Sequence, residues 1–143
     1  MENRLQHGVI FVATLCFFLV NPAVAGEVSH LLDGMAFVGN NGEKGHELDP
    51  DEHEEIVFEN GRFRSISCEP YKFSDSEYST TVVGNTIHFK AETTSPSHGK
   101  IVWQGTVEGD TALMTFVWTK ERWYWNTHRE YWFRGKLKKV KEL

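Results

Sequence analysis

The stretch 42–55 holds the densest group of side chains that could bind a metal ion. Carboxylate oxygens are the usual ligands of Ca²⁺, and histidine nitrogens would suit Zn²⁺. The spacing fits neither metal, because an EF-hand loop needs a glycine at its sixth position and two histidines seven residues apart are not a usual zinc pair. We therefore interpret the stretch as an acidic, solvated connection and expect neither a metal site nor a cofactor. The candidate ligands are His46, Asp49, Asp51, Glu52, His53, Glu54 and Glu55.

Histidines that could act as acids or bases after residue 25 stand at positions 30, 46, 53, 88, 98 and 128. None lies in a Gly-x-Ser-x-Gly, phosphate-loop or His-Glu-x-x-His motif. His88 alternates with the apolar Ile87 and Phe89, so we expect it on the solvent-facing side of a strand. A catalytic set built from distant strands is recognised only by its geometry. The sequence therefore leaves the question of an enzyme open and favours a role without catalysis.

A second chemically informative group lies in the stretch 120–135, where aromatic residues are mixed with charged ones. Trp123 and Trp125 fall in the connection between the last two expected strands. Rings at positions i and i+2 beside a barrel mouth would form a flat amphipathic surface for a lipid chain, a sugar or an aromatic ligand. The alternative is that both rings fold over the barrel end and plug it against water.

Two further residues are candidates for ligand contact, Trp118 near the end of the preceding strand and Arg129 at the start of the last one. If Phe133 faces inward, Arg129 shares its face and could stack on an aromatic ring or pair with an anionic ligand group. The alternative for Arg129 is a solvent-exposed ion pair with Glu121 or Glu130. The candidate ligand-binding residues are therefore Trp118, Trp123, Trp125 and Arg129.

The elements that position these residues are β-strands, because apolar and polar residues alternate with period two over short runs. About eight such runs with tight turn signals between them, and no convincing helix, predict an all-β fold, a single antiparallel up-and-down barrel. A β-sandwich is the alternative. The expected strands are 35–39, 56–58, 62–66, 78–83, 86–92, 100–107, 111–119 and 129–137. The expected core contains Ile87, Phe89, Trp103, Val107, Phe116, Tyr131 and Phe133.

The segment 1–25 has the features of a cleavable export signal. A short polar start precedes an apolar run, and Ala23-Val24-Ala25 matches the small-x-small cleavage pattern. The run is too short to span a bilayer, which takes roughly 20 apolar residues. We therefore expect a signal peptide at 1–25, a single barrel domain at 26–143, and export to the periplasm or the medium with no membrane span after signal removal.

Charge and cysteine content limit the partners. The chain of 143 residues carries a formal net charge of −5, which disfavours nucleic acid bound through its phosphates. Because Cys16 lies in the expected signal, Cys68 is left without an intramolecular partner. We expect Cys68 to be a buried packing residue, with an exposed thiol that bridges two copies as the alternative. The sequence leaves the oligomeric state open.

Four segments carry a resemblance to a known type of protein. They read LDGMAFVG at 32–39, IVFENGRF at 56–63 with Ser67-Cys68 following, WQGTV at 103–107, and YWFRGKL at 131–137. In this order the chain resembles small exported bacterial proteins of lipocalin-like β-barrel type. The resemblance implies a binding cup, so we expect a small apolar or amphipathic ligand, or another component of the cell envelope, as the partner. The alternatives are an interaction or inhibitor protein with a filled barrel as scaffold, and a cofactor-free enzyme.

Overall fold

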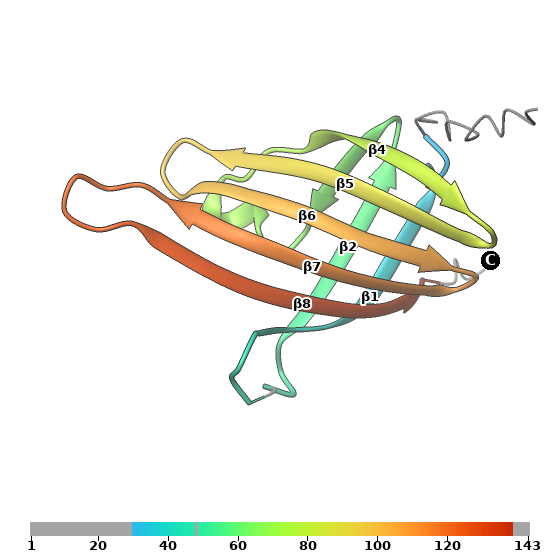
Figure 1. Ribbon diagram of the computed structural model, residues 1–143, viewed down its shortest axis with the longest axis horizontal. Coiled ribbons are helices and arrows are strands. Elements are labelled where there is room, and N and C mark those ends of the chain that lie inside the picture. Colours follow the sequence, from blue (N-terminus) through green and yellow to red (C-terminus); the bar gives the residue numbers. More distant parts are fainter. Residues whose placement is uncertain (1–29, 48, 139–143) are drawn as a thin grey trace, which may run out of the picture.

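The computed structural model describes residues 30–47 and 49–138. In this part of the chain each strand pairs antiparallel with its sequence neighbours, and β8 pairs with β1 to close a barrel (Figure 1). The predicted all-β up-and-down barrel is therefore confirmed over the β-sandwich, whereas the predicted signal peptide lies outside the described residues. The elements are β1 (Met35–Glu43), β2 (His53–Glu59), β3 (Arg62–Ser65), the 3₁₀-helix η1 (Glu69–Tyr71), β4 (Ser76–Val83), β5 (Thr86–Ser95), β6 (Gly99–Glu108), β7 (Thr111–Lys120) and β8 (Thr127–Leu137).

The strands lie where the period-two pattern predicted them, although several are longer. β1 continues to Glu43, and β2 begins at His53. Asn60 and Gly61 form the predicted hairpin turn between β2 and β3, with φ angles of 53° and 72°. Both residues of a type I′ turn need positive φ, which asparagine and glycine tolerate. A Cβ at Gly61 would also meet the ring of the exposed His30, which would have to move.

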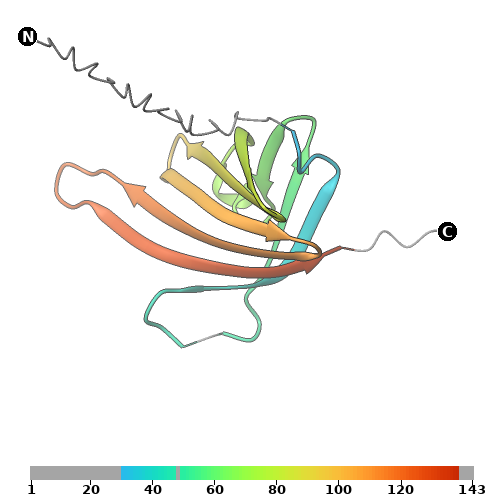
Figure 2. The ribbon, with the colours of Figure 1, turned by 45° about the vertical axis from the view of Figure 1, so that its right-hand side comes forward.

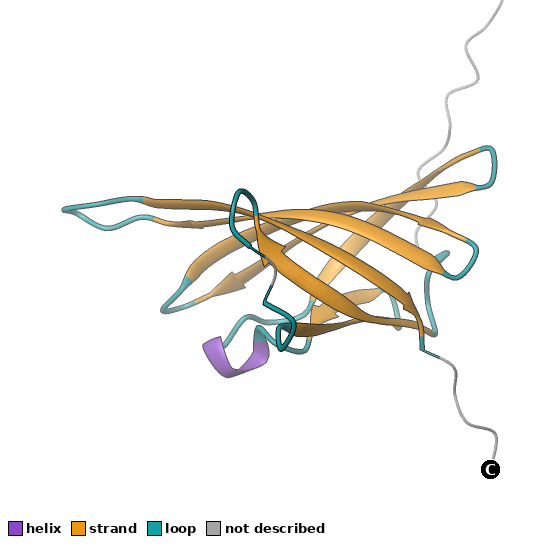
Figure 3. Ribbon diagram, turned by 90° about the horizontal axis from the view of Figure 1, so that it is seen from below, coloured by secondary structure: helices purple, strands orange, loops and turns teal. Residues whose placement is uncertain are grey.

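The two ends of the barrel differ. Turns of two residues join β2 to β3, β4 to β5 and β6 to β7, and with the segment 30–34 they form what we call the closed end. Longer connections, at 44–52, 66–75, 96–98 and 121–126, lie at the opposite end, which we call the open end. The β7–β8 connection extends well beyond the other strands in Figures 1 and 2. Figure 3 shows η1 at the same end of the barrel.

The closed end is sealed by the segment that precedes β1. Leu32 in this segment is fully buried. The Asp33 carboxylate accepts hydrogen bonds from the backbone N–H of Gly61, at 2.9 and 3.0 Å, and from the Tyr78 hydroxyl, at 2.7 Å. Burial, and then the neighbouring Asp33 carboxylate, raise the pKa of the Tyr78 phenol. Tyr78 therefore keeps its proton and remains a donor, and the chain itself closes this end of the barrel.

Aromatic rings fill the barrel from the closed end to its middle. Trp103 is fully buried, and its Nε1 donates a hydrogen bond to Thr93 Oγ1 at 3.0 Å. Phe58 packs against the rings of Phe37, Phe63, Tyr78 and Phe89. The predicted core residues Phe89, Trp103, Val107, Phe116 and Phe133 are buried, while Ile87 and Tyr131 are half-buried and pack against the core. Little of this part of the barrel is left for a ligand.

The seam between β1 and β8 closes the barrel and depends on small residues. Gly39 of β1 lies directly opposite Gly135 of β8. A Cβ on Gly39 would collide with the backbone of Arg134 and Gly135. Glycine at position 39 therefore allows the first and last strands to approach within hydrogen-bonding distance.

Candidate functional site

A cavity of about 470 Å³ lies at the open end of the barrel. The ring of Phe116 separates it from the core, because Phe116 stacks on the buried Trp103 with 4.2 Å between ring centroids. Tyr131 stacks on Phe116 in turn, at 5.0 Å. The cavity therefore begins where the aromatic filling of the barrel stops. Its apolar and aromatic lining consists of Tyr71, Phe73, Ile101, Phe116, Trp118 and Tyr131.

One side of the cavity is polar and centres on Glu54, which is only 2% exposed. Its Oε1 accepts hydrogen bonds from the backbone N–H of Glu55 at 2.9 Å and of Ser67 at 3.2 Å. Its Oε2 accepts from the hydroxyls of Ser65, at 2.8 Å, and Ser67. Burial raises the pKa of the Glu54 carboxyl, and the hydrogen bonds from the two serines oppose that rise. The network fixes the carboxyl against β3 and the connection that follows it.

The burial of Glu54 corrects the interpretation of 42–55 as solvated throughout. β2 begins at His53, and alternate side chains of a strand point to the same side, so Glu54 shares the inward face of Phe58. The other described residues of the connection, within 44–53, are exposed as expected. Counting back in steps of two from Phe58 reaches Glu54, so the sequence did contain the signal that would have found it.

Two more polar residues of the cavity were not among the predicted ligand residues. Asn41 Oδ1 is buried and has no hydrogen-bond partner in the described part of the chain. Cys68 is half-buried and packs against the core, close to its predicted packing role. Burial raises the pKa of its thiol, which disfavours the thiolate that a nucleophile requires. A disulfide between two copies stays a prediction.

Among the predicted ligand residues, Trp118 lines the cavity. Its Nε1 donates a hydrogen bond to the backbone oxygen of His98 at 2.6 Å, which holds the indole at the rim. Arg129 is not among the lining residues and is exposed, with Nη1 3.4 Å from Glu43 Oε2. The alternative of an exposed ion pair is therefore present, but the partner is Glu43 of the adjacent strand β1 and not Glu121 or Glu130. A ligand role for Trp118 and Arg129 stays a prediction.

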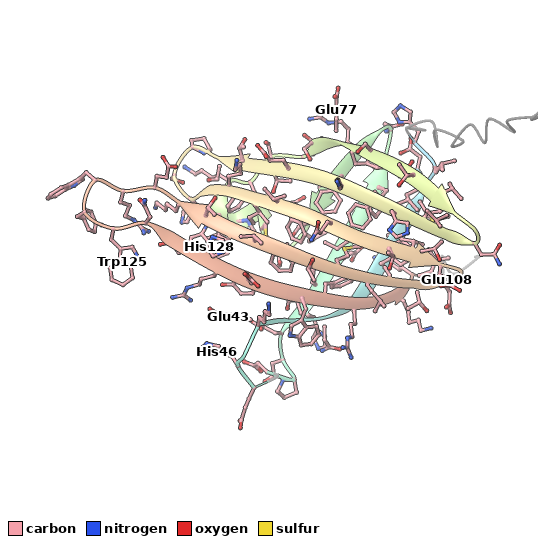
Figure 4. The ribbon with its side chains drawn as sticks, viewed as in Figure 1. Glu43, His46, Glu77, Glu108, Trp125 and His128 are labelled. Carbon is pink, nitrogen blue, oxygen red and sulfur yellow. The ribbon has the colours of Figure 1, made fainter. Side chains whose placement is uncertain are left out.

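Trp123 and Trp125 lie at the tip of the β7–β8 connection, away from the cavity. Trp123 is 96% exposed and Trp125 67% exposed, and Figure 4 shows Trp125 at the far end of this hairpin. The alternative that they plug the barrel is therefore wrong. Arg122 gives the tip a defined shape, because its backbone N–H donates to Asn126 Oδ1 at 3.2 Å and its Nη1 donates to Thr127 Oγ1 at 2.8 Å.

Two other kinds of site find little support. In residues 30–47 and 49–138 no group of three or more His, Cys, Asp or Glu is arranged to hold a metal ion. Ser97 Oγ lies 2.8 Å from His98 Nδ1 in an exposed turn, but no carboxylate of the described residues bonds to His98 to orient it as a catalytic base. His88 is exposed on β5, as predicted.

A second hollow, of about 410 Å³, lies on the outer surface of β5, β6, β7 and β8. Outward-facing side chains such as Trp132 and Arg134 border it, with the Arg134 guanidinium 5.6 Å from the centre of the Trp132 ring. It contains no buried polar group without a partner among the residues described. The cavity at the open end is therefore the stronger candidate, because it combines an apolar wall with buried polar groups.

Comparison of the chain with protein-family models, with curated proteins and with solved structures found no match. None of the described helices is long and apolar enough to cross a membrane.

Proposed function

We propose that this protein is an exported, lipocalin-like carrier or receptor that binds a small apolar or amphipathic molecule without chemical change. The observation that carries the proposal is the cavity of about 470 Å³ at one end of an otherwise filled barrel. This volume lies in the range of known ligand pockets, about 300 to 1,000 Å³. A barrel that served only as a scaffold would have no need of such a space.

The composition of the wall supports an amphipathic ligand. Phe116, Trp118 and Tyr131 offer ring surface on which an apolar chain or ring can bury its area, which is the main source of affinity in such pockets. Asn41 and Glu54 place polar atoms on the polar side of the cavity, where they would orient one polar group of the ligand. Export and the lipocalin-like assignment rest on the segment 1–25 and on the sequence resemblance.

Native mass spectrometry and binding of the neutral dye Nile red test this proposal. The residue 26–143 protein should retain a small molecule on purification or bind the dye. Asn41→Phe should abolish binding because the ring would occupy the cavity, and it should fold because it also removes an unpartnered amide oxygen. Val38→Phe is the matched control, since Val38 lies on the same strand and is 40% exposed. Undiminished dye binding by Asn41→Phe, or none by the unaltered protein, would refute the proposal.

A second candidate function is attachment to a lipid bilayer through the β7–β8 tip. It is favoured by three consecutive exposed aromatic side chains, with Tyr124 at 66% exposed between Trp123 and Trp125. Tryptophan and tyrosine prefer the interfacial zone of a bilayer, where one part of the ring meets apolar chains and the polar N–H or O–H meets water.

Sedimentation with phosphatidylcholine vesicles tests this second function. The unaltered protein should sediment with the vesicles, and Trp123→Ala with Trp125→Ala should not. Val83→Ala is the control, because Val83 is 64% exposed but belongs to the closed end. Equal sedimentation of the double variant, or none of the unaltered protein, would reject attachment through the tip.

A further inference from the structure

The cavity carries an excess of negative charge. Of the described residues that line it, Asp51, Glu52 and Glu54 are acidic and none is a lysine or an arginine. Of these described lining residues, only His53 and His98 carry a basic side chain. Arg129 of the last strand is exposed and is paired with Glu43. Because like charges repel most strongly where water is displaced, this wall opposes a carboxylate ligand.

Glu54 is the part of this charge that solvent screens least. Glu54 is 2% exposed, and within the described residues no lysine or arginine forms an ion pair with it. Its hydrogen-bond donors are neutral hydroxyl and amide groups, those of Ser65, Ser67 and Glu55. A buried carboxylate is costly unless a positive charge lies near it. A cationic ligand would supply the charge that the chain does not.

The remaining polar and aromatic groups suit the same ligand. Asn41 Oδ1 is a buried acceptor to which none of the described residues donates, and an ammonium group brings three N–H donors and no acceptor. Phe116, Trp118 and Tyr131 present ring surface on which the apolar part of such a ligand can bury its area. Acceptors on one side and rings on the other form a site for an amine attached to an apolar group.

We propose that the cavity selects a cationic amphiphile, an alkyl or aryl amine in its protonated form, and discriminates against carboxylates of the same size. This inference rests on the proposed function, because it assigns the ligand class of the same cavity. The ammonium lies on the side of Asn41 and Glu54, and the apolar part lies against Phe116 and Tyr131. No covalent step is involved.

Isothermal titration of three probes of equal chain length tests the selectivity at neutral pH. Octylamine, which is protonated there, should bind most tightly, 1-octanol less tightly, and octanoate at least about tenfold more weakly than octylamine, as expected for charges near a partly dehydrated wall. Equal binding of all three, or preference for octanoate, would overturn the inference while leaving the proposed function intact. Failure of all three, octanol included, would count against the proposed function itself.

Substitutions locate the source of the preference. Glu54→Gln should weaken octylamine binding by about tenfold and leave octanol binding unchanged, because it removes charge but keeps the shape of the side chain. Glu59→Gln is the matched control, since Glu59 lies on the same strand but is exposed at the closed end. Unchanged octylamine binding by Glu54→Gln would contradict the assigned position of the ammonium.

A second variant keeps the test decisive if Glu54→Gln does not fold. Asp51→Asn with Glu52→Gln alters two exposed side chains at the mouth of the cavity and should not disturb the barrel. It should reduce octylamine binding by a smaller factor, about two- to fivefold, because exposed charges are screened by water. A preference for octylamine over octanoate that is fully retained in this variant would argue against the charge mechanism.

Discussion

Each end of the barrel contains a hydrogen-bonded carboxylate, but one end is filled and the other has a cavity. At the closed end the Asp33 carboxylate accepts hydrogen bonds from Gly61 and Tyr78, and Leu32 beside it is fully buried. At the open end the Glu54 carboxylate accepts hydrogen bonds from Ser65 and Ser67, but a cavity lies beside it. In both places a carboxylate ties together segments that are distant in sequence. Within residues 30–47 and 49–138, only the closed end also has an apolar side chain, Leu32, that fills the space.

The connections between strands account for this difference. Two-residue turns at the closed end hold the strand ends together, so one short segment is enough to cover them. The longer connections of the open end leave the strand ends apart, and the β7–β8 hairpin extends away from the mouth (Figure 2). The cavity therefore results from the course of the longer connections. The filled half of the barrel supports it rigidly.

The largest effect is expected at the boundary between the filled half and the cavity. Trp103→Ala should lower the free energy of unfolding by about 3 to 5 kcal/mol, because it removes a fully buried indole and leaves a void. It also removes the hydrogen bond to Thr93. Chemical denaturation followed by circular dichroism measures the change. A loss below about 1 kcal/mol would show that the filled half is not close-packed around this ring.

A smaller loss is expected at the closed end. Asp33→Ala should cost about 1 to 3 kcal/mol, because it leaves the Gly61 N–H and the Tyr78 hydroxyl without their acceptor. Asp75→Ala is the control, since Asp75 forms an exposed ion pair with Arg62 at 3.0 Å that should contribute little. Thermal unfolding of both variants compares them. Equal losses would mean that the carboxylate does not seal this end.

Replacement of the Glu54 carboxyl at the open end should raise the free energy of unfolding, whereas replacement of the Asp33 carboxylate should lower it. The size of the Glu54 effect should depend on pH. Burial raises the folded-state pKa of Glu54 above its ordinary value of 4.5. A raised pKa favours the neutral acid in the folded protein, so its contribution to stability is fully present below about 4.5 and is lost as pH rises through the folded-state pKa. Glu54→Gln should therefore gain stability relative to the unaltered protein as pH rises from about 4.5 to neutrality.

Urea unfolding of both proteins across this pH range measures the difference. Glu59→Gln should show no such trend, because its side chain is exposed. A difference that shrinks with rising pH would show that the four hydrogen bonds stabilise the carboxylate more than burial opposes it.

The smallest effect on stability is expected at the β7–β8 tip. Trp123→Ala with Trp125→Ala should change the free energy of unfolding by less than about 0.5 kcal/mol, because both side chains are largely exposed. Thermal unfolding provides the measurement. A clear fall in melting temperature would mean that the rings pack against the barrel in solution.

The sequence predicted the barrel because period two depends only on neighbouring residues within a strand. The same pattern put Trp118 on the face of Phe116, and both residues line the cavity. It did not predict the inward position of Glu54, because the charges around this residue resemble those of a solvated loop and hid its place in the period. The direction of Trp123 and Trp125 could not be predicted either, since it depends on how far β7 and β8 pair beyond the barrel. Cavity volume depends on how all side chains pack together, which no local pattern contains.

The seam between β1 and β8 has a consequence for folding and for self-association. All other strand pairs join sequence neighbours and can form early, whereas Gly39 and Gly135 meet only after nearly the whole barrel has been ordered. Until then the sheet has two free edges, and unpaired strand edges are templates for joining other chains. Gly39 and Gly135 have no side chains, so nothing at these two positions hinders the pairing of a free edge with another chain. We therefore expect the late folding intermediate, more than the finished barrel, to be the form of this protein that aggregates.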